Sequence, residues 1–255
     1  TSIAVAAAVT ATSLPMSFEV QAAGFQEEKK REKRPTNLVG PSVGKKVQKA
    51  FEAYTAEDID GAIEILMAIK TKKDYDSAYV NRFIANMLAQ KGENLKAIEY
   101  LNKAIAPDIL NEPEQADSLK LVAQLESQEK KYADAIKHFK MWMDFTGKQD
   151  AMIWVRIGQA YMEMKQFDNV IKPADNAIAL FKAQGKPNQN PYILKIHSYY
   201  ERKQFKSAVK VLEEVVQEMV PYFIKDYGNP SSIHRYGRLA NKAVQTARKR
   251  IADLI

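Results

Sequence analysis

The stretch WVRIGQAY, residues 154–161, places Trp154, Gly158 and Tyr161 on one side of a helix. None of these side chains is a usual catalytic group. The phrase FDNVIKPA follows at residues 167–174 and predicts a second helix. Small or β-branched residues at Gly158 and Val170 would let the two helices approach closely, and the tryptophan and tyrosine would fill the space between them. The stretch therefore predicts a packed pair of helices.

Related phrases recur along the chain as IDGAIEIL, LKAIEYL, YADAIKHF and FKSAVKVL. The small or β-branched residue of the five phrases falls at Ala62, Ala97, Ala135, Val170 and Ala208, in steps of 35, 38, 35 and 38 residues. A period of about 34 residues with this spacing is the signature of the tetratricopeptide (TPR) repeat. Since one helix pair cannot bury its apolar face alone, neighbouring pairs must stack. We expect an all-α fold, a TPR-type α-solenoid of about five helix pairs over residues 43–220, with an extra C-terminal helix.

Further positions in the repeats carry specific expectations. The longer steps place extra residues in the inter-repeat loops within 106–115 and 181–191. Pro173 should kink the second helix of the fourth pair, and the acidic run at 57–60 should cap a helix start. Five aromatic side chains are expected to be buried between helices: Trp154, Tyr161, Phe167, Tyr199 and Phe205.

The formal net charge of +7 is concentrated at the two ends of the chain. Residues 27–34 carry five basic and three acidic groups, and residues 221–255 carry seven basic and two acidic groups. A nucleic-acid-binding protein needs a basic stripe that neutralises several phosphates. The predicted solenoid is close to neutral, so we expect no nucleic-acid partner.

The residues that enzymes and metal sites use are scarce. Cysteine is absent, which excludes thiol catalysis, zinc–thiolate sites and disulfides. The chain has three histidines, His138, His197 and His234. For none of them do we expect a second histidine or a carboxylate at metal-ligand spacing on the same helical face. Glycine-rich phosphate loops and nucleophile elbows are also absent. We therefore expect a non-enzymatic protein without a cofactor or a metal.

The N-terminal run TSIAVAAAVTATSLPMSFEVQAAG ends in a small-residue pattern typical of a signal-peptide cleavage site. Residues 1–26 are interpreted as a signal-peptide remnant, and the alternative is a disordered N-terminus or a short helix. The charged run and the prolines and glycines after it predict a solvated linker over residues 27–42. No stretch of the chain approaches the roughly 18 apolar residues of a membrane span.

A protein or peptide partner would bind to the concave face of a solenoid, which the first helix of each pair lines. The non-core positions of these helices make a mixed surface of cations, amides and tyrosines that suits an extended peptide or a helix. The alternative is that the three cations are simply solvated. The candidate residues are Tyr79, Arg82, Asn86, Lys120, Gln124, Met152, Arg156, Gln159, His197 and Tyr200.

Residues 42–215 carry phrases with a more specific resemblance, among them SVGKKVQKAFEAY, KKDYDSAYVNRFIANM, KHFKMWMDFTGKQD and NPYILKIHSYYERKQF. They resemble the periplasmic TPR proteins encoded with TonB energy-transducing systems in marine and related gammaproteobacteria. The resemblance implies a secreted, periplasmic, non-enzymatic accessory of iron or siderophore uptake, with TonB-complex components among its partners. It carries no binding residues over. The alternative function is a general peptide-binding co-chaperone or an envelope-assembly adaptor.

The last 35 residues, 221–255, differ from the rest and contain NPSSIHRYGR at 229–238. This segment resembles an N-terminal part of the cysteine desulfurases of the NifS/IscS type. That family's pyridoxal phosphate lysine context and catalytic cysteine do not occur in these 255 residues, so we transfer none of its chemistry. A hybrid of two proteins is one interpretation, and an ordinary end helix is the other. The apolar stripe of such a helix would be Leu239, Ala243, Ala247, Ile251 and Ile255. We expect a helical tail that docks weakly beyond a hinge at residues 228–230.

Overall fold

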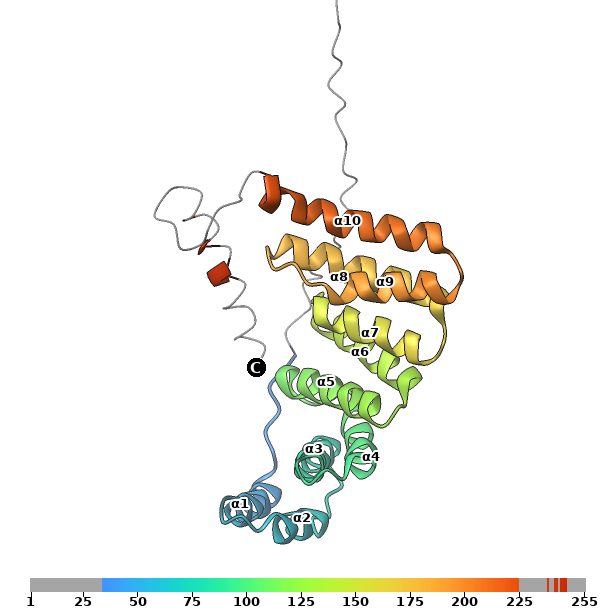
Figure 1. The fold of residues 1–255 in the computed structure, drawn as a ribbon. Coiled ribbons are helices and arrows are strands. Elements are labelled where there is room, and N and C mark those ends of the chain that lie inside the picture. The colour runs from blue at the N-terminus through green and yellow to red at the C-terminus, as the bar shows by residue number, and fades with distance from the viewer. Residues whose placement is uncertain (1–33, 225–237, 239–240, 243, 247–255) are drawn as a thin grey trace, which may run out of the picture.

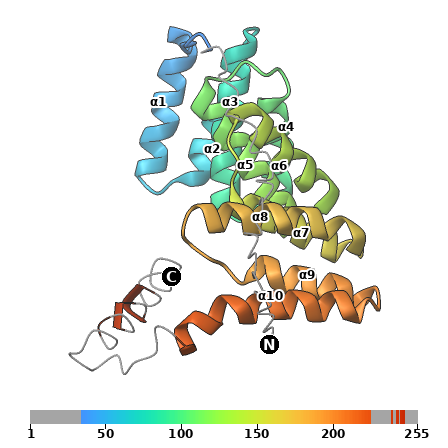
Figure 2. The same cartoon turned by 90° about the horizontal axis from the view of Figure 1, so that it is seen from above.

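A computed structural model describes residues 34–224, 238, 241–242 and 244–246 of the chain. The regular structure in these residues is entirely helical, and no strand occurs in them. The helices form five pairs that stack in chain order (Figures 1 and 2). The pairs are α1 (Pro41–Thr55) with α2 (Ile59–Met67), α3 (Asp74–Gln90) with α4 (Asn94–Ile105), α5 (Glu112–Gln128) with α6 (Tyr132–Thr146), α7 (Ala151–Glu163) with the 3₁₀ helix η1 (Phe167–Val170) and α8 (Ile171–Ala183), and α9 (Asn190–Glu201) with α10 (Phe205–Ile224). The predicted all-α solenoid of about five pairs is confirmed.

The five repeat positions found in the sequence lie in the packed core. The side chains of Ala62, Ala97, Ala135 and Val170 are 0% exposed, and Ala208 in the last pair is 7% exposed. Each lies near the start of the second helix of its pair. A small side chain at these points lets the two helix backbones come close, because a larger one would have to displace a packed neighbour.

A left-handed residue lies in the turn inside every pair, five positions before the buried small residue. The φ angles there are +65° at Glu57, +78° at Gly92, +58° at Lys130, +56° at Lys165 and +58° at Lys203. Side chains with a Cβ atom are strained in this region, and glycine is not. The second pair uses glycine, whereas the other four use glutamate or lysine, so four turns carry backbone strain.

The helix starts agree in part with the sequence. Asp58 caps α2 by accepting a hydrogen bond from the Gly61 N–H at 2.9 Å, as the acidic run predicted. Pro173, however, does not kink the middle of a helix. The second segment of the fourth pair begins as the 3₁₀ helix η1, and Pro173 is the third residue of α8. In a first turn the missing N–H of proline costs little, since this group has no partner within the helix there.

The aromatic expectations are confirmed only partly. Trp154 and Tyr161 are partly buried and pack against the core between α5, α6 and α7. Phe167 and Tyr199 are also partly buried. The expectation for Phe205 is wrong, since this side chain is 54% exposed. Phe205 begins α10, the last helix of the stack, and no further repeat covers it in the described part of the chain.

Some expectations fall on residues beyond those that the structure describes. The predicted signal-peptide remnant at 1–26, residues 27–33 of the predicted linker, the hinge at 228–230 and the stripe of the predicted tail helix lie outside the described residues. Residues 34–40 are described, and they contact the solenoid rather than extending into solvent. Within the described residues, no helix combines the length and apolarity required to cross a membrane.

The turn geometry gives a matched pair of stability predictions. Lys130→Gly should raise the free energy of unfolding by about 1 kcal/mol, because glycine removes the cost of a left-handed backbone. Gly92→Ala should lower it by about the same amount. No atom lies within 4 Å of the Cβ that the alanine would add, so the backbone alone sets that cost. Urea unfolding of both variants measures the effect. Equal destabilisation by the two substitutions would contradict the turn assignment.

Candidate interaction surface

The ten predicted surface residues lie on four first helices, α3, α5, α7 and α9. Six of them are exposed: Asn86, Met152, Arg156, Gln159, His197 and Tyr200. The other four are partly buried: Tyr79, Arg82, Lys120 and Gln124. The α7 and α9 positions are therefore the ones most available to a partner.

A groove of about 380 Å³ lies between α7 and α9. It brings together two of the predicted residues, Gln159 of α7 and His197 of α9. The two helices approach closely here, because Gly158 has no side chain. A Cβ at this position would lie 3.1 Å from Leu194 Cδ1 of α9. The remaining lining residues are Met162, Glu163, Lys165, Phe167, Leu194 and Glu201. The groove thus combines an apolar floor with amide, imidazole and charged groups.

His197 has a carboxylate partner on its own helix, which corrects the expectation drawn from the sequence. The distance between His197 Nε2 and Glu201 Oε1 is 3.2 Å, and the two residues are four positions apart. Sequence inspection missed this i, i+4 pair, although such spacing places two side chains on one helical face. In the described part of the chain, no group of three or more His, Cys, Asp or Glu side chains is arranged to hold a metal ion.

Tyr79 lies in a row of tilted aromatic rings on α3 and is not open to a partner. The Tyr79 ring lies 6.0 Å from the Tyr75 ring and 5.0 Å from the Phe83 ring, centroid to centroid. Burial, and next the charge of Glu114, raise the pKa of the Tyr79 hydroxyl. The Arg82 guanidinium lies 6.0 Å from the centroid of the Phe83 ring. Tyr79 and Arg82 therefore have packing roles within the repeat.

Lys120 links the third and fourth repeats. Its Nζ lies 3.9 Å from Asp150 Oδ2 and 5.3 Å from the centroid of the Trp142 ring. Asp150 also caps α7, since its Oδ1 accepts hydrogen bonds from the Met152 N–H at 2.8 Å and the Ile153 N–H at 3.1 Å. The cap orients the first turn of α7, which carries Met152 into the predicted surface.

The sequence did not predict the exposed apolar surface that α9 and α10 form together. Tyr200 is 61% exposed, and its ring packs edge-on against Phe205 at 5.7 Å between centroids. Val209, Leu212 and Val216 continue the exposed apolar surface along α10. The spacing of three and four residues was visible in the sequence, but the same spacing also describes a buried helix face.

Comparison with solved structures supports the fold. One crystal structure of the MamA protein superposes with a TM-score of 0.54 at 16% identity, covering 74% of this chain and 98% of that chain. A MamA structure from Desulfovibrio magneticus RS-1 gives a TM-score of 0.51 at 14% identity, covering 71% of this chain and 96% of that chain. Such low identity shows the fold alone, a TPR-type solenoid. No family model matches this chain.

Short segments also match curated cysteine desulfurases. The mitosomal enzyme of Trachipleistophora hominis is 39% identical over 101 residues, which are 39% of this chain and 20% of that protein. The NifS enzyme of Azotobacter vinelandii is 37% identical over 49 residues, which are 19% of this chain and 12% of that protein. This chain thus spans a fifth or less of the length of these two relatives. The matches agree with the family that residues 221–255 resemble, and they cover too little to carry a whole enzyme's activity to this chain.

The dual role of Asp150 gives a second prediction. Asp150→Ala should lower the free energy of unfolding by about 1 kcal/mol, because two N–H groups of α7 lose their acceptor. Asp150→Asn should cost clearly less, since asparagine also caps helices and only the half-exposed ion pair with Lys120 is lost. Thermal unfolding of the two variants side by side provides the measurement. If asparagine proves as costly as alanine, the ion pair rather than the cap is the stabilising contact.

Proposed function

We propose that the chain is a non-enzymatic scaffold that binds a protein partner on its first helices. The observation that carries the proposal is the row of exposed, chemically mixed side chains on neighbouring helices of a TPR-type solenoid. Met152 and Gln159 of α7 and His197 and Tyr200 of α9 lie in this row. An extended peptide or a helix can contact several successive repeats at once, and a solenoid presents its side chains for this kind of binding.

We further propose that the scaffold acts in the periplasm, as an accessory of a TonB-dependent system for iron or siderophore transport. Support comes from the resemblance of residues 42–215 to periplasmic TPR proteins encoded with such systems. The N-terminal run that ends in a cleavage-site pattern is consistent with export. Components of the TonB complex are the proposed partners.

The second candidate function is a general peptide-binding co-chaperone or envelope-assembly adaptor. The groove between α7 and α9 favours it, because Met162, Leu194 and Phe167 offer adaptable apolar contacts beside polar groups. A general adaptor would bind many unrelated segments, whereas a transport accessory would bind one complex. The identity of the captured partners therefore separates the two candidates.

Photo-crosslinking from single positions in cells tests the proposal. A photoreactive residue at Met152, Gln159 or Tyr200 should give adducts with TonB-complex components, identified by mass spectrometry. Matched controls are the exposed positions Lys96 of α4 and Lys172 of α8, which lie on second helices and should give none. Adducts with many unrelated envelope proteins would favour the adaptor. Adducts that are equally strong from the control positions would contradict binding by the first helices.

A further inference from the structure

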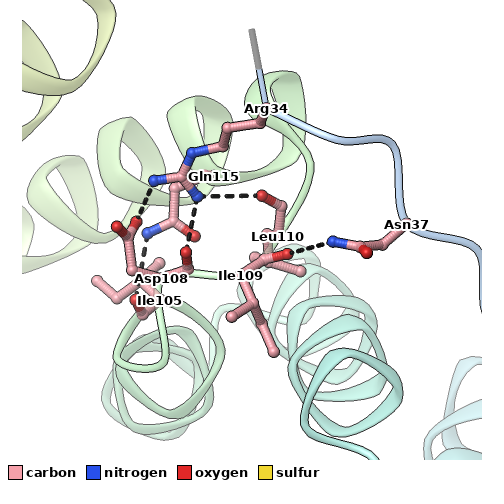
Figure 3. A network of polar contacts seen from close by, with 7 residues as sticks. All are labelled: Arg34, Asn37, Ile105, Asp108, Ile109, Leu110 and Gln115. Carbon is pink, nitrogen blue, oxygen red and sulfur yellow. Dashed lines mark hydrogen bonds and ion pairs between the residues drawn. The ribbon is translucent and has the colours of Figure 1, made fainter. Parts of the chain in front are cut away.

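Residues 34–40, called the strap below, bind in an extended form to a distant part of the same chain. The strap runs past the loop between α4 and α5 before α1 begins at Pro41 (Figures 1 and 3). Its hydrogen-bond partners in that loop and at the start of α5 lie 72 to 76 residues away in the sequence. These bonds hold the strap on the second and third repeats.

The residues that contact the strap, Asp76, residues 108–111 and Phe145, are called the receptor below. The part of the receptor that holds Arg34 suits a guanidinium group. It donates hydrogen bonds to Asp108 Oδ1 at 2.7 Å, to the Asp108 carbonyl at 2.8 Å and to the Leu110 carbonyl at 3.3 Å (Figure 3). The guanidinium carbon also lies 4.6 Å from the centroid of the Phe145 ring. A carboxylate, two carbonyls and an aromatic face match the planar, donor-rich guanidinium better than the compact ammonium of lysine.

Asn111 and Asp76 bind the strap through its backbone. Asn111 Oδ1 accepts the Asn37 N–H at 2.8 Å, and Asn111 Nδ2 donates to the Asn37 carbonyl at 3.2 Å. The buried Asp76 side chain accepts the Gly40 N–H at 2.9 Å. Such bonds do not depend on side-chain identity, and they are how proteins commonly hold an extended peptide.

Only two strap side chains are recognised through polar contacts with this loop. The first is Arg34, and the second is Asn37, whose Nδ2 donates to the Ile109 carbonyl at 3.1 Å (Figure 3). Pro35 and Thr36 between them are exposed, and Leu38 is 86% exposed. The strap side chains that make these contacts are therefore an arginine and an asparagine three positions apart.

The receptor is held in place by contacts of its own. Glu114 accepts the Asn111 N–H at 3.1 Å in a capping box, and the Tyr75 hydroxyl accepts from Asn111 Nδ2 at 2.7 Å and donates to Glu114 at 3.3 Å. Burial, and next the charge of Glu114, raise the pKa of Tyr75 to about 12, so the hydroxyl keeps its proton at neutral pH. The loop lies in one of the two longer repeat steps, and Asp108 in it adopts a φ of +50°. The receptor thus has internal hydrogen bonds in addition to those with the strap.

Beside the Arg34 site lies a cavity that the strap does not fill. The cavity has a volume of about 500 Å³ and is lined by Asp108 and Phe145, which also contact Arg34, and by Gln115 of α5. Gln115 is 2% exposed, and its Oε1 is a buried acceptor without a hydrogen-bond partner in the described part of the chain. An unpaired buried acceptor of this kind costs free energy in the folded chain. Room therefore remains beside the bound arginine.

We propose that Asp76, the loop residues 108–111 and Phe145 form a binding site for an extended partner peptide with an arginine and an asparagine three positions apart. The strap occupies this site until such a peptide displaces it. The site lies at the α4–α5 loop, so it is separate from the α7 and α9 surface and does not rest on the function proposed above. Because the strap is covalently attached, its effective concentration is of the order of millimolar, and a free peptide binds weakly while the strap is seated.

A competition experiment on the full chain tests the proposal. The probe is the fluorescently labelled heptapeptide RPTNLVG, which copies residues 34–40. The opened variant carries Arg34→Ala with Asn37→Pro, which removes the guanidinium and the N–H that Asn111 accepts. Fluorescence anisotropy should show binding to the opened variant at least about tenfold tighter than to the unmodified chain. Circular dichroism shows whether the variant keeps its helices, and Arg34→Ala alone replaces it if it does not.

Two matched controls make the result specific. A peptide with lysine in place of the arginine should bind the opened variant more weakly, because an ammonium cannot reach the same acceptors and ring together. Phe145→Leu in the opened background should also weaken binding, since it keeps an apolar side chain but removes the aromatic face. A folded, opened variant that does not bind the peptide would show the strap to be a structural brace and overturn the proposal. A dimer of the unmodified chain that forms by exchange of straps would also overturn the proposal, because the site would then bind a second copy of this chain.

Discussion

The close approach of two helices at a small residue is the constraint on which this solenoid depends. Ala62, Ala97, Ala135 and Val170 are fully buried at equivalent points of four pairs. A left-handed residue five positions earlier turns the chain so that this approach can occur. With the geometry of each pair set, the next pair covers the remaining apolar face, and the first helices fall into a row. The candidate surface on α7 and α9 is a consequence of that stacking.

The sequence predicted the part of the structure that repeats. The period located all five pairs and the buried small residues, because helix packing imposes the same requirement every 35 or 38 residues. The errors lie where the repetition ends or is broken. Phe205 is exposed because no described repeat covers α10, and Pro173 is accommodated in a first turn after η1. Register alone predicts the surface residues, and it cannot tell the exposed Met152 from Tyr79, whose ring packs at a tilt against two aromatic neighbours.

The strap was missed for a different physical reason. Its sequence follows a charged run and contains proline and glycine, which is typical of a solvated linker. The contacts that hold it are formed mostly by backbone groups and by partners more than 70 residues away, as with Asn37 and Asn111. No periodic pattern signals such contacts. One feature of the sequence does relate to the strap, namely the longer step between Ala97 and Ala135. The extra residues of this step lie in the loop that binds Arg34. The two proposed binding surfaces of this solenoid therefore differ in their chemistry.

Hydrogen exchange on the full chain with Ala135→Leu tests most directly whether small residues hold the stack together pair by pair. A leucine at this fully buried position must force α5 and α6 apart, at a cost of about 1–3 kcal/mol. Since the helices of each repeat contact mainly those of the neighbouring repeats, exchange should accelerate in α5 and α6, less in α4 and α7, and hardly at all in α1 and α9. The account predicts this graded pattern. Equal acceleration in every helix from α1 to α10, or none in any of them, would contradict it.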